Sequence, residues 1–443
     1  MMTVLPLPIG TIGSGAFAGA LAWAARHNEL IDIAIFVLTY IGMAIGGLPG
    51  TRLDRASIAT LGAVAVLLFH RMTFQQAMNE INFPTLALLV SMMVISAQLR
   101  LAGYYDWVVR RIVAAGKSPR NLLAFIMLSA ALLSALFAND VICLIFTPVL
   151  CLAMRRAGRD PIPYLMALAV SANIGSAATV IGNPQNMLIG QAGNLSFAAF
   201  TLTVLPLVVV SLALAYVAVA TIYHRRIFRE PVKPVELPTD HPAAQQVVTR
   251  WSMIHKTLVI MGLLLVAMVA GEWIGLSRPV AALAAAGLVL ISRKTRPRDL
   301  FTLVDWNLIL LFIGLFIVIG DAQRHALLAP AMHAIAHAGI SLKSHGPLAA
   351  TTLVLSNLVS NVPAVLLLKP AIPVAATSTW YLLAVVSTFA GNLTLLGSIA
   401  NLIVAEQAKQ FSINLRFTEY LKVGVPLTLV STSLAVVYFH LIH

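Results

Sequence analysis

The chain has 443 residues, of which 59% are hydrophobic and only 10% are Asp, Glu, Lys or Arg, against about 25% in an ordinary soluble domain. A soluble core of this length could not bury so much apolar surface. Apolar stretches such as 30–47, 83–97 and 200–223 approach or reach the ~20 residues that a spanning helix needs. The composition therefore predicts an all-α polytopic membrane protein with about 10–11 spanning helices.

The formal net charge of +13 does not indicate a nucleic-acid partner. The basic residues form short clusters between apolar segments, such as Arg110-Arg111, Arg155-Arg156 and Arg293-Lys294, with no basic arm or aromatic-interleaved groove beside them. This distribution is the positive-inside pattern of cytoplasmic loops. We therefore expect a multi-pass protein of a bacterial inner (plasma) membrane, with the lipid bilayer as its partner.

Four segments follow one another along the chain. Residues 1–50 hold an N-terminal segment and a first helix; the first 28 residues lack the basic start of a signal peptide and are compatible with an extra helix or a surface segment. Residues 51–223 form a first repeat, 224–256 a cytoplasmic linker with four prolines, and 257–443 a second repeat. Cys143 and Cys151, the two cysteines, form neither a disulfide framework nor a zinc site.

The repeat is visible in four matches that occur in the same order in both halves. Their offsets are 223, 223, 222 and 215 residues. The matched elements are Arg55 and Arg278, Asn82 and Asp305, Ser134-x4-Asn139-x8-Pro148 and Ser356-x4-Asn361-x8-Pro370, and Thr179-x2-Gly182-x3-Asn186 and Thr394-x2-Gly397-x3-Asn401. The nearly constant offset indicates an internal duplication.

Charge predicts how the two repeats are oriented. The segment near 120–157 has Lys117 and Arg120 before it and Arg155, Arg156 and Arg159 after it, so both of its ends should be cytoplasmic. A segment that enters and leaves on one side is a re-entrant hairpin. The equivalent hairpin near 345–375 has far less positive charge at its ends, which places it on the opposite side. The repeats are therefore predicted to be inverted.

Each hairpin has a polar tip within an apolar run, Asn139-Asp140 in the first and Ser360-Asn361 in the second. A turn at membrane depth must be buried in protein or line a wet cavity, because unpaired backbone groups are costly in hydrocarbon. The alternative interpretation is two ordinary helices whose polar residues mediate packing.

A broken helix is expected near 161–192 and another near 378–407. The stretches 171–186 and 388–401 interrupt apolar spans with Gly, Asn, Ser and Thr, and the first also contains Pro184. Such breaks free amides and carbonyls at half-helix ends, which can hold an oxyanion or a cation. Small-residue helix packing of the Gly-x-x-x-Gly type is the alternative.

The sequence resembles the ion transporter superfamily, and in particular arsenite permeases, plant silicon efflux transporters and bacterial anion permeases. The resemblance runs from about Thr51 to the C-terminus. It is carried by the blocks Leu136-Phe-Ala-Asn-Asp140, Ser171-Ala-Asn-Ile-Gly-Ser176, Ile181-Gly-Asn-Pro-Gln-Asn186, Ser360-Asn-Val-Pro363 and Ala390-Gly-Asn-Leu-Thr-Leu-Leu-Gly397. It implies two re-entrant hairpins, two broken helices, and a homodimer in which a transport domain slides against a scaffold.

The resemblance also implies substrate and ion sites where these elements meet, with sodium at the hairpin tips in some members. By position, the implied binding residues are Asn139, Asp140, Asn173, Ser176, Thr179, Gly182, Asn183, Asn186, Ser360, Asn361, Asn392, Thr394, Gly397, Ser398 and Asn401. Sodium–dicarboxylate members carry Ser-Asn-Thr at both tips, whereas this chain has Ala138-Asn139-Asp140 and Ser360-Asn361-Val362. A carboxylate at one tip weakens the case for an incoming dianion and for two sodium sites.

Charged residues within the membrane are costly and usually functional. Asp140 is the favoured proton-linked group, because burial favours the protonated form of a carboxyl group and lets it exchange a proton during transport. Asp321 and Glu406 are the further candidates for proton coupling, and both positions are equally compatible with a solvated helix cap.

The favoured function is secondary active transport, namely proton-coupled efflux of a small weak oxyacid of a metalloid, such as silicic or arsenous acid. The alternative is a sodium-coupled carboxylate or inorganic-anion symporter, and an anion channel is a third possibility. A hydrolase is not expected, because the sequence has neither a Ser/His pair nor a His-Glu-x-x-His helix. The chain is therefore predicted to be no enzyme and to need no cofactor, with H⁺ as coupling ion and Na⁺ as the alternative.

Overall fold

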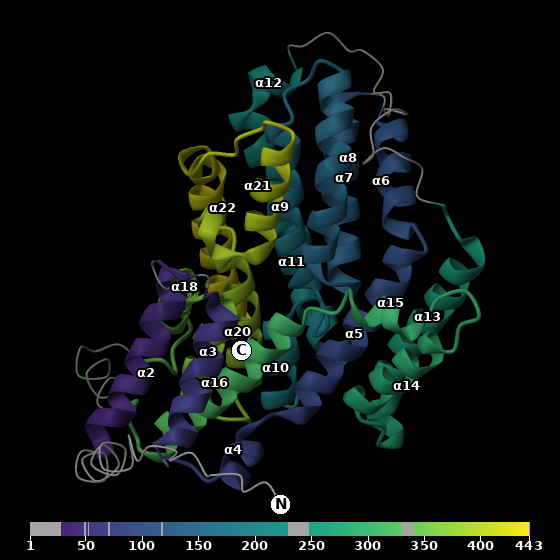
Figure 1. Cartoon of the computed structure of the whole chain (residues 1–443). Helices are drawn as coiled ribbons and strands as arrows, with labels where there is room; N and C mark the ends of the chain where they lie inside the picture. Colours follow the sequence, from purple (N-terminus) through teal and green to yellow (C-terminus); the bar gives the residue numbers. More distant parts are fainter. Residues whose placement is uncertain are drawn as a thin grey trace, which may run out of the picture. The chain divides into compact units, whose positions relative to one another are not determined.

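The computed structural model describes residues 28–47, 50, 51, 53–69, 71–116, 118–228, 248–329, 337 and 341–442. All regular secondary structure within these ranges is helical (Figure 1). Among the described residues, six helices are long and apolar enough to cross a membrane: Phe83–Leu101, Pro119–Leu136, Phe197–Ile222, Trp251–Ile274, Trp306–Arg324 and Phe417–Leu441. Four shorter apolar helices accompany them. The prediction of an all-α polytopic membrane protein is confirmed.

Some expectations fall outside the described residues. These are most of the N-terminal segment (1–27), Lys117 at the start of the first hairpin, and residues 229–247 of the expected linker. Within the range of that linker the structure has α12 (His224–Phe228) and the start of α13, which begins at Trp251 rather than after residue 256.

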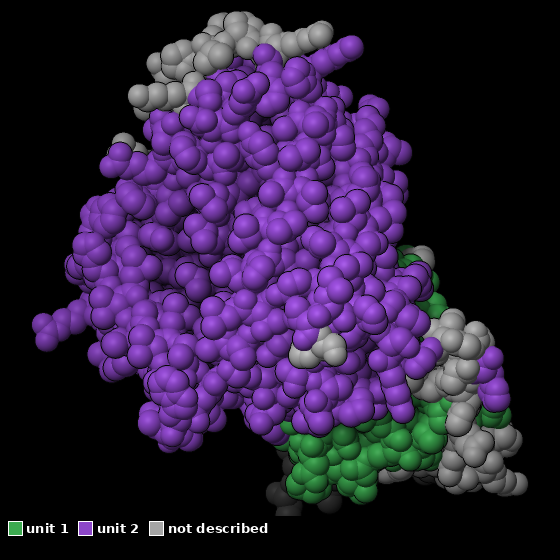
Figure 2. Space-filling view, turned by 180° about the vertical axis from the view of Figure 1, so that it is seen from behind, with its two compact units in different colours: residues 1–81, 310–334 green, residues 82–309, 335–443 purple. Residues whose placement is uncertain are grey.

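The described helices belong to two compact units, which Figure 2 distinguishes by colour. Unit 1 comprises residues up to 81 and 310–334; its helices are α2 (Asn28–Ile45), α3 (Arg55–Leu68), α4 (Phe74–Glu80) and most of α16 (Trp306–Arg324). The units do not follow the sequence repeats, since unit 1 takes helices from both of them.

Small residues bring the helices of unit 1 close together. A Cβ on Gly314 would lie 2.6 Å from the backbone of Ala59, so α16 and α3 approach at a distance that only glycine permits.

Local capping fixes where two helices of unit 1 begin. Asp54 accepts a 2.8 Å hydrogen bond from the Ser57 amide at the start of α3, and Thr73 begins α4 with a capping box.

Unit 2 contains residues 82–309 and 335–443. Its elements from the first half of the chain are α5 (Phe83–Leu101), α6 (Tyr104–Ala115), α7 (Pro119–Leu136), α8 (Asn139–Arg156), α9 (Ile162–Ser176), α10 (Pro184–Ala192), α11 (Phe197–Ile222) and α12. Those from the second half are α13 (Trp251–Ile274), α14 (Arg278–Leu290), α15 (Pro297–Phe301), α18 (His345–Val359), α19 (Asn361–Leu368), η2 (Lys369–Ala371), α20 (Thr377–Ala390), η3 (Leu395–Gly397), α21 (Ile399–Gln410) and α22 (Phe417–Leu441).

The first repeat contains a helical hairpin and an interrupted helix. Helices α7 and α8 run beside each other and are joined by Phe137 and Ala138 alone (Figure 1). Helix α9 then packs against α7, where a Cβ on Gly175 would collide with the backbone of Ala131. After α9 the chain is non-helical until Pro184, which begins α10 because proline needs no intrahelical partner for its nitrogen in the first turn.

The second repeat has the same sequence of elements. A single residue, Ser360, separates α18 from α19, and its backbone has φ 79° and ψ 161°, a conformation that is strained for any residue except glycine. Helix α20 is separated from α21 by a short non-helical stretch around η3. Because strained backbone is found preferentially at functional sites, the tip at Ser360 is a candidate functional position.

Candidate functional site

The two helix breaks are closed by the same hydrogen bonds. The side-chain amide of Asn186 donates to the carbonyls of Ser176 (3.4 Å) and Thr179 (3.0 Å), ten and seven residues earlier. The amide of Asn401 donates to the carbonyls of Gly391 (2.7 Å) and Thr394 (3.2 Å), again ten and seven residues earlier. One asparagine per repeat thus donates to two carbonyls of each break. The Ser176 carbonyl also accepts from Asn183, and the Thr179 and Thr394 carbonyls also accept from the amides of Gly182 and Gly397.

The two repeats also exchange contacts reciprocally. Asn173 of the first repeat accepts a 3.0 Å hydrogen bond from Ser398 and donates one of 3.0 Å to Asn401. Thr388 of the second repeat accepts from Asn183 at 3.1 Å, and its hydroxyl, which donates to the Ala384 carbonyl at 2.8 Å, lies 3.4 Å from the Asn186 side-chain oxygen. Each residue of one set lies 215 positions from its counterpart in the other. Such a reciprocal pattern is what a twofold relation between the repeats produces.

Asn173 uses the hydrogen-bonding capacity of its whole amide. Besides the contacts above, its oxygen accepts from Asn139 at 3.2 Å and its nitrogen donates to Asn392 at 2.9 Å. The tip of the first hairpin is therefore attached to both broken helices. We call this set of buried side chains the polar hub: Asn139, Asn173, Ser176, Asn183, Asn186, Thr388, Asn392, Ser398 and Asn401.

Each break is also attached to an arm of the hairpin in its own repeat. The Thr179 hydroxyl donates to the carbonyl of Ala135 in α7, and the Thr394 hydroxyl donates to the side-chain oxygen of Asn357 in α18 at 3.1 Å. Asn357 in turn donates to the carbonyl of Ala390 at 3.0 Å. Both broken helices are thus joined by hydrogen bonds to the hairpins beside them.

Two glycines make these turns sterically feasible. A Cβ on Gly182 would overlap the carbonyl oxygen of Ser176, six residues earlier. The counterpart Gly397 is less crowded, because its Cβ would lie 3.2 Å from the Gly391 carbonyl and 2.8 Å from the movable side chain of Asn357. The first break therefore depends on its glycine more strictly than the second.

The tip of the second hairpin offers an open acceptor. The side-chain oxygen of Asn361 is buried and has no hydrogen-bond partner in the described part of the chain. A buried oxygen without a partner is unfavourable by about 1–3 kcal/mol, so this atom is suited to accept from a ligand. Together with the strain at Ser360, it distinguishes this tip from Asn139, which is bound into the hub.

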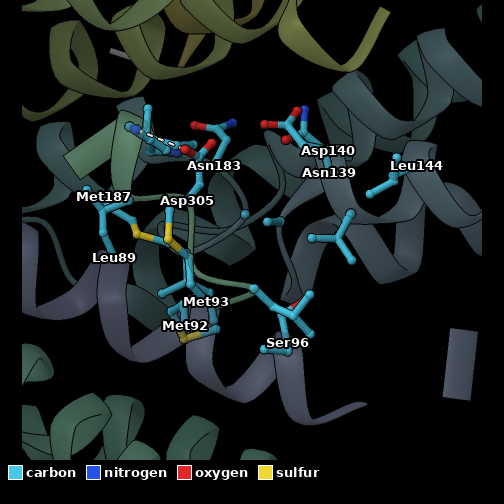
Figure 3. Close-up of a pocket in the computed structure, with 18 of the residues that line it drawn as sticks. Leu89, Met92, Met93, Ser96, Asn139, Asp140, Leu144, Asn183, Met187 and Asp305 are labelled. Carbon is cyan, nitrogen blue, oxygen red and sulfur yellow. Dashed lines mark hydrogen bonds between the residues drawn. The ribbon is translucent and has the colours of Figure 1, made fainter. Parts of the chain in front are cut away.

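A cavity of about 190 Å³ lies beside the first tip. Its walls come from α5, the start of α8, the end of the first break, the segment before α16, and α21. Most of the lining is apolar, including Met92, Met93 and Met187. Figure 3 shows Asn139, Asp140, Asn183 and Asp305 among the residues around it.

Asp140 is the charged residue that the first tip contributes to this cavity. Its half-buried carboxylate forms no hydrogen bond or ion pair with any residue in the described ranges. Two further charged side chains line the cavity, Arg100 from α5 and Asp305 just before α16. Asp305 and Asp140 both line the cavity, so their carboxylates add like charges to it.

The other two candidates for proton coupling lie elsewhere. Glu406 is exposed on α21 and does not line the cavity. Asp321 is buried in unit 1, where Asp32, Asp321 and His325 place ligand atoms within 4.8 Å of one another, a spacing compatible with a metal ion. Arg71 already donates to both carboxylate oxygens of Asp32 and contacts His325, so the cluster is held by ion pairs in this structure.

The structure thus brings most of the predicted site residues of the first and second repeats into one hydrogen-bonded set, with Gly182, Gly397 and Asn361 beside it. Four residues were not predicted as site residues: Thr388, Asn357, Asp305 and Arg100. The repeat offset signals one of them, because Thr388 is the counterpart of the predicted site residue Asn173; the counterparts of Asp305 and Asn357, Asn82 and Ala135, were not predicted as site residues. Nothing in the sequence pattern singles out Arg100.

The described part of the chain is all-helical, with membrane-length helices, two hairpins, and two interrupted helices that the polar hub joins to the tip of the first hairpin. This architecture is that of a multi-pass membrane transporter. Residues 37–390 match the family model described as "CitMHS: Citrate transporter". The chain belongs to this family of transporters.

Individual relatives agree with this assignment. The "Silicon efflux transporter LSI3" of Oryza sativa subsp. japonica is 30% identical, covering 94% of this chain and 98% of that protein. The "Putative transporter arsB" of Dictyostelium discoideum is 26% identical, covering 89% and 88%. The crystal structure of the Alcanivorax borkumensis YdaH transporter, described as having an unusual topology, shares the fold, with a TM-score of 0.53, 15% identity and coverage of 94% and 98%.

Proposed function

We propose that this protein exports a small weak oxyacid of a metalloid, such as arsenous or silicic acid, in exchange for protons. The observation that carries the proposal is Asp140, whose carboxylate faces the cavity at a hairpin tip without a hydrogen bond or ion pair in the described structure. Such a carboxylate can gain and lose a proton as the cavity opens and closes. The relatives named for silicon efflux and for arsB support the substrate class.

Hydrogen bonds, rather than thiolates, are proposed to hold the substrate. Cys143 and Cys151 are both buried in α8, and two cysteines are fewer than the three sulfurs that trivalent arsenic favours. The open oxygen of Asn361, with Asn139, Thr179 and Thr394, is proposed to address the hydroxyls of the acid. Since each hydrogen bond contributes only about 1 kcal/mol net, a site of this kind can bind and then release.

Alternating access of the elevator type is proposed as the mechanism. The polar hub cross-links α8, α9, α20 and α21, which supports movement of these helices as one body. In this proposal the hairpins are re-entrant, the repeats are inverted in the membrane, and two chains form a homodimer in a bacterial inner membrane. Breaks in both repeats favour alternating access over a permanent pore, and hence a transporter over a channel.

Sodium-coupled uptake of a carboxylate is the second candidate, because the matching family model is described by citrate. The charge at the cavity favours the first candidate, since two carboxylates and one guanidinium line it. A citrate anion entering there would meet more negative than positive charge.

Transport by the purified protein in proteoliposomes distinguishes the two. Arsenous acid, silicic acid and citrate are each offered under an imposed pH gradient and, separately, under a sodium gradient. The proposal predicts accumulation of one or both metalloid acids that depends on the pH gradient and not on sodium. Sodium-driven accumulation of citrate, with no response of the metalloid acids, would replace it by the second candidate.

A further inference from the structure

Asp305 caps the start of a helix and also adds a negative charge to the lining of the cavity. Its side-chain oxygen accepts a 3.0 Å hydrogen bond from the Leu308 amide and so caps the start of α16. Its counterpart in the first repeat, Asn82, caps α5 in the same way, with a 3.0 Å hydrogen bond from the Thr85 amide. Asparagine and aspartate serve about equally well as N-caps, so capping does not explain a carboxylate at position 305.

The two caps differ in what their side chains face. Asp305 lines the cavity beside Asp140, whereas Asn82 is not among the cavity's lining residues (Figure 3). The carboxylate of Asp305 therefore adds a negative charge to the cavity that an asparagine would not add.

Basic side chains do not cancel this charge. Arg100 is the basic residue among the described residues that line the cavity. Two carboxylates thus face the cavity against one guanidinium. The lining is otherwise mostly apolar, and such surroundings screen charges less than water does.

We propose that Asp305, acting with Asp140, is a specificity-determining residue that makes the cavity accept uncharged hydroxo acids and reject anions such as carboxylates. This inference rests on the proposed function and narrows its substrate to the protonated, neutral form of the acid. A neutral acid enters without electrostatic penalty, whereas a carboxylate anion is repelled from the cavity in proportion to its charge.

The test compares an isosteric pair of cap variants in proteoliposomes. Asp305→Asn keeps the cap and removes the charge, while the control Asn82→Asp adds a charge to the equivalent cap outside the cavity. The measured quantity is the citrate concentration that half-inhibits counterflow of radiolabelled arsenous acid, divided by the KM for arsenous acid. The expected ratio falls at least about tenfold in Asp305→Asn, as removal of one nearby charge implies, and stays within about twofold of the wild type in Asn82→Asp.

Two additions keep the test decisive. Asp305→Glu keeps a carboxylate at position 305 and should therefore keep the ratio of citrate half-inhibition to KM that the wild type has. If Asp305→Asn transports too slowly to assay, the rise of its melting temperature in citrate, compared with that of the wild type, tests the same gain of anion binding. An unchanged ratio and no gain of citrate binding would overturn the role of Asp305 while proton-driven transport of arsenous acid by the wild type stands. Transport of citrate by the wild type would overturn the proposed function as well.

Discussion

The side chains of Asn186 and Asn401 bind the backbone in the same way, although 215 residues separate them. Each amide donates to the carbonyls ten and seven residues earlier and so closes the break in its own helix. The duplication is therefore retained as a hydrogen-bond arrangement as well as a sequence pattern. Since both side chains are almost fully buried, water cannot easily replace the hydrogen bonds that they donate.

Replacing Asn401 should destabilise the protein more than replacing Asn186. Asn401→Ala removes the side-chain donor of the Gly391 carbonyl, and we expect a loss of about 1–3 kcal/mol in the free energy of unfolding. Asn186→Ala should cost less, because the Ser176 carbonyl keeps its bond from Asn183 and the Thr179 carbonyl keeps its bond from the Gly182 amide. The measurement is unfolding of the purified protein in detergent. The matched control is the exposed Asn79, whose replacement by alanine should change stability by no more than about 0.5 kcal/mol. A neutral result for either hub variant would contradict the structural role.

The glycines of the two breaks should differ in their tolerance of a methyl group. Gly182→Ala forces a Cβ into the Ser176 carbonyl and should abolish accumulation of folded protein. Gly397→Ala should be milder, because the side chain of Asn357 can move. Gly287 within α14 has no atom near its Cβ position, so Gly287→Ala should be neutral or stabilising by about 0.4–1 kcal/mol. Fluorescence size-exclusion profiles of the three variants test this order.

The inverted arrangement of the repeats predicts opposite labelling of the two hairpins. Labelling sites on the first hairpin must be exposed residues near its two ends. Arg120→Cys and Arg155→Cys meet this condition, whereas Ala157 is buried and Lys117 lies outside the described residues. In a background without native cysteines, both introduced cysteines should react with an impermeant maleimide only after the cells are opened. Thr377→Cys, exposed after the second hairpin, should react in intact cells. Efficient labelling of Arg120→Cys or Arg155→Cys from outside would exclude the predicted topology.

Substrate recognition should depend on Asn361 and not on the cysteines. Asn361→Ala removes the open acceptor at the second tip and should nearly abolish transport, whereas the double change Cys143→Ser and Cys151→Ser should keep it within a few-fold of the parent. Counterflow in proteoliposomes measures both, with size-exclusion profiles to establish folding. A cysteine-free protein that is folded but inactive would require thiolate chemistry instead.

The sequence predicts the helical breaks well because each break needs residue types that are rare in spanning helices. Pro184, Gly182 and the asparagines around them disfavour an uninterrupted helix, and the recurrence of the glycine and of Asn186 as Gly397 and Asn401 strengthens the prediction. The register of the duplication also indicates in advance that Asn186 and Asn401 occupy equivalent positions.

The partners of these residues could not be predicted in the same way. Thr388 accepts a hydrogen bond from Asn183 across the two repeats, a contact that depends on how two distant helices pack. Arg100 lines the cavity because of the way α5 is rotated about its own axis. Since α5 is largely apolar, its sequence does not indicate which face of the helix turns towards the cavity. Asp305 could be aligned with Asn82, but only the cavity reveals that the aspartate adds a charge where the asparagine does not.

If Asp140 couples transport to protons, substrate should drive a proton flux that depends on this carboxylate. Proteoliposomes containing an entrapped pH indicator receive a pulse of arsenous acid or silicic acid, with Asp140→Asn compared with the wild type and with the exposed Glu406→Gln. We expect a substrate-dependent pH change in the wild type and in Glu406→Gln, and none in folded Asp140→Asn. An undiminished pH change in Asp140→Asn would contradict proton coupling through this residue.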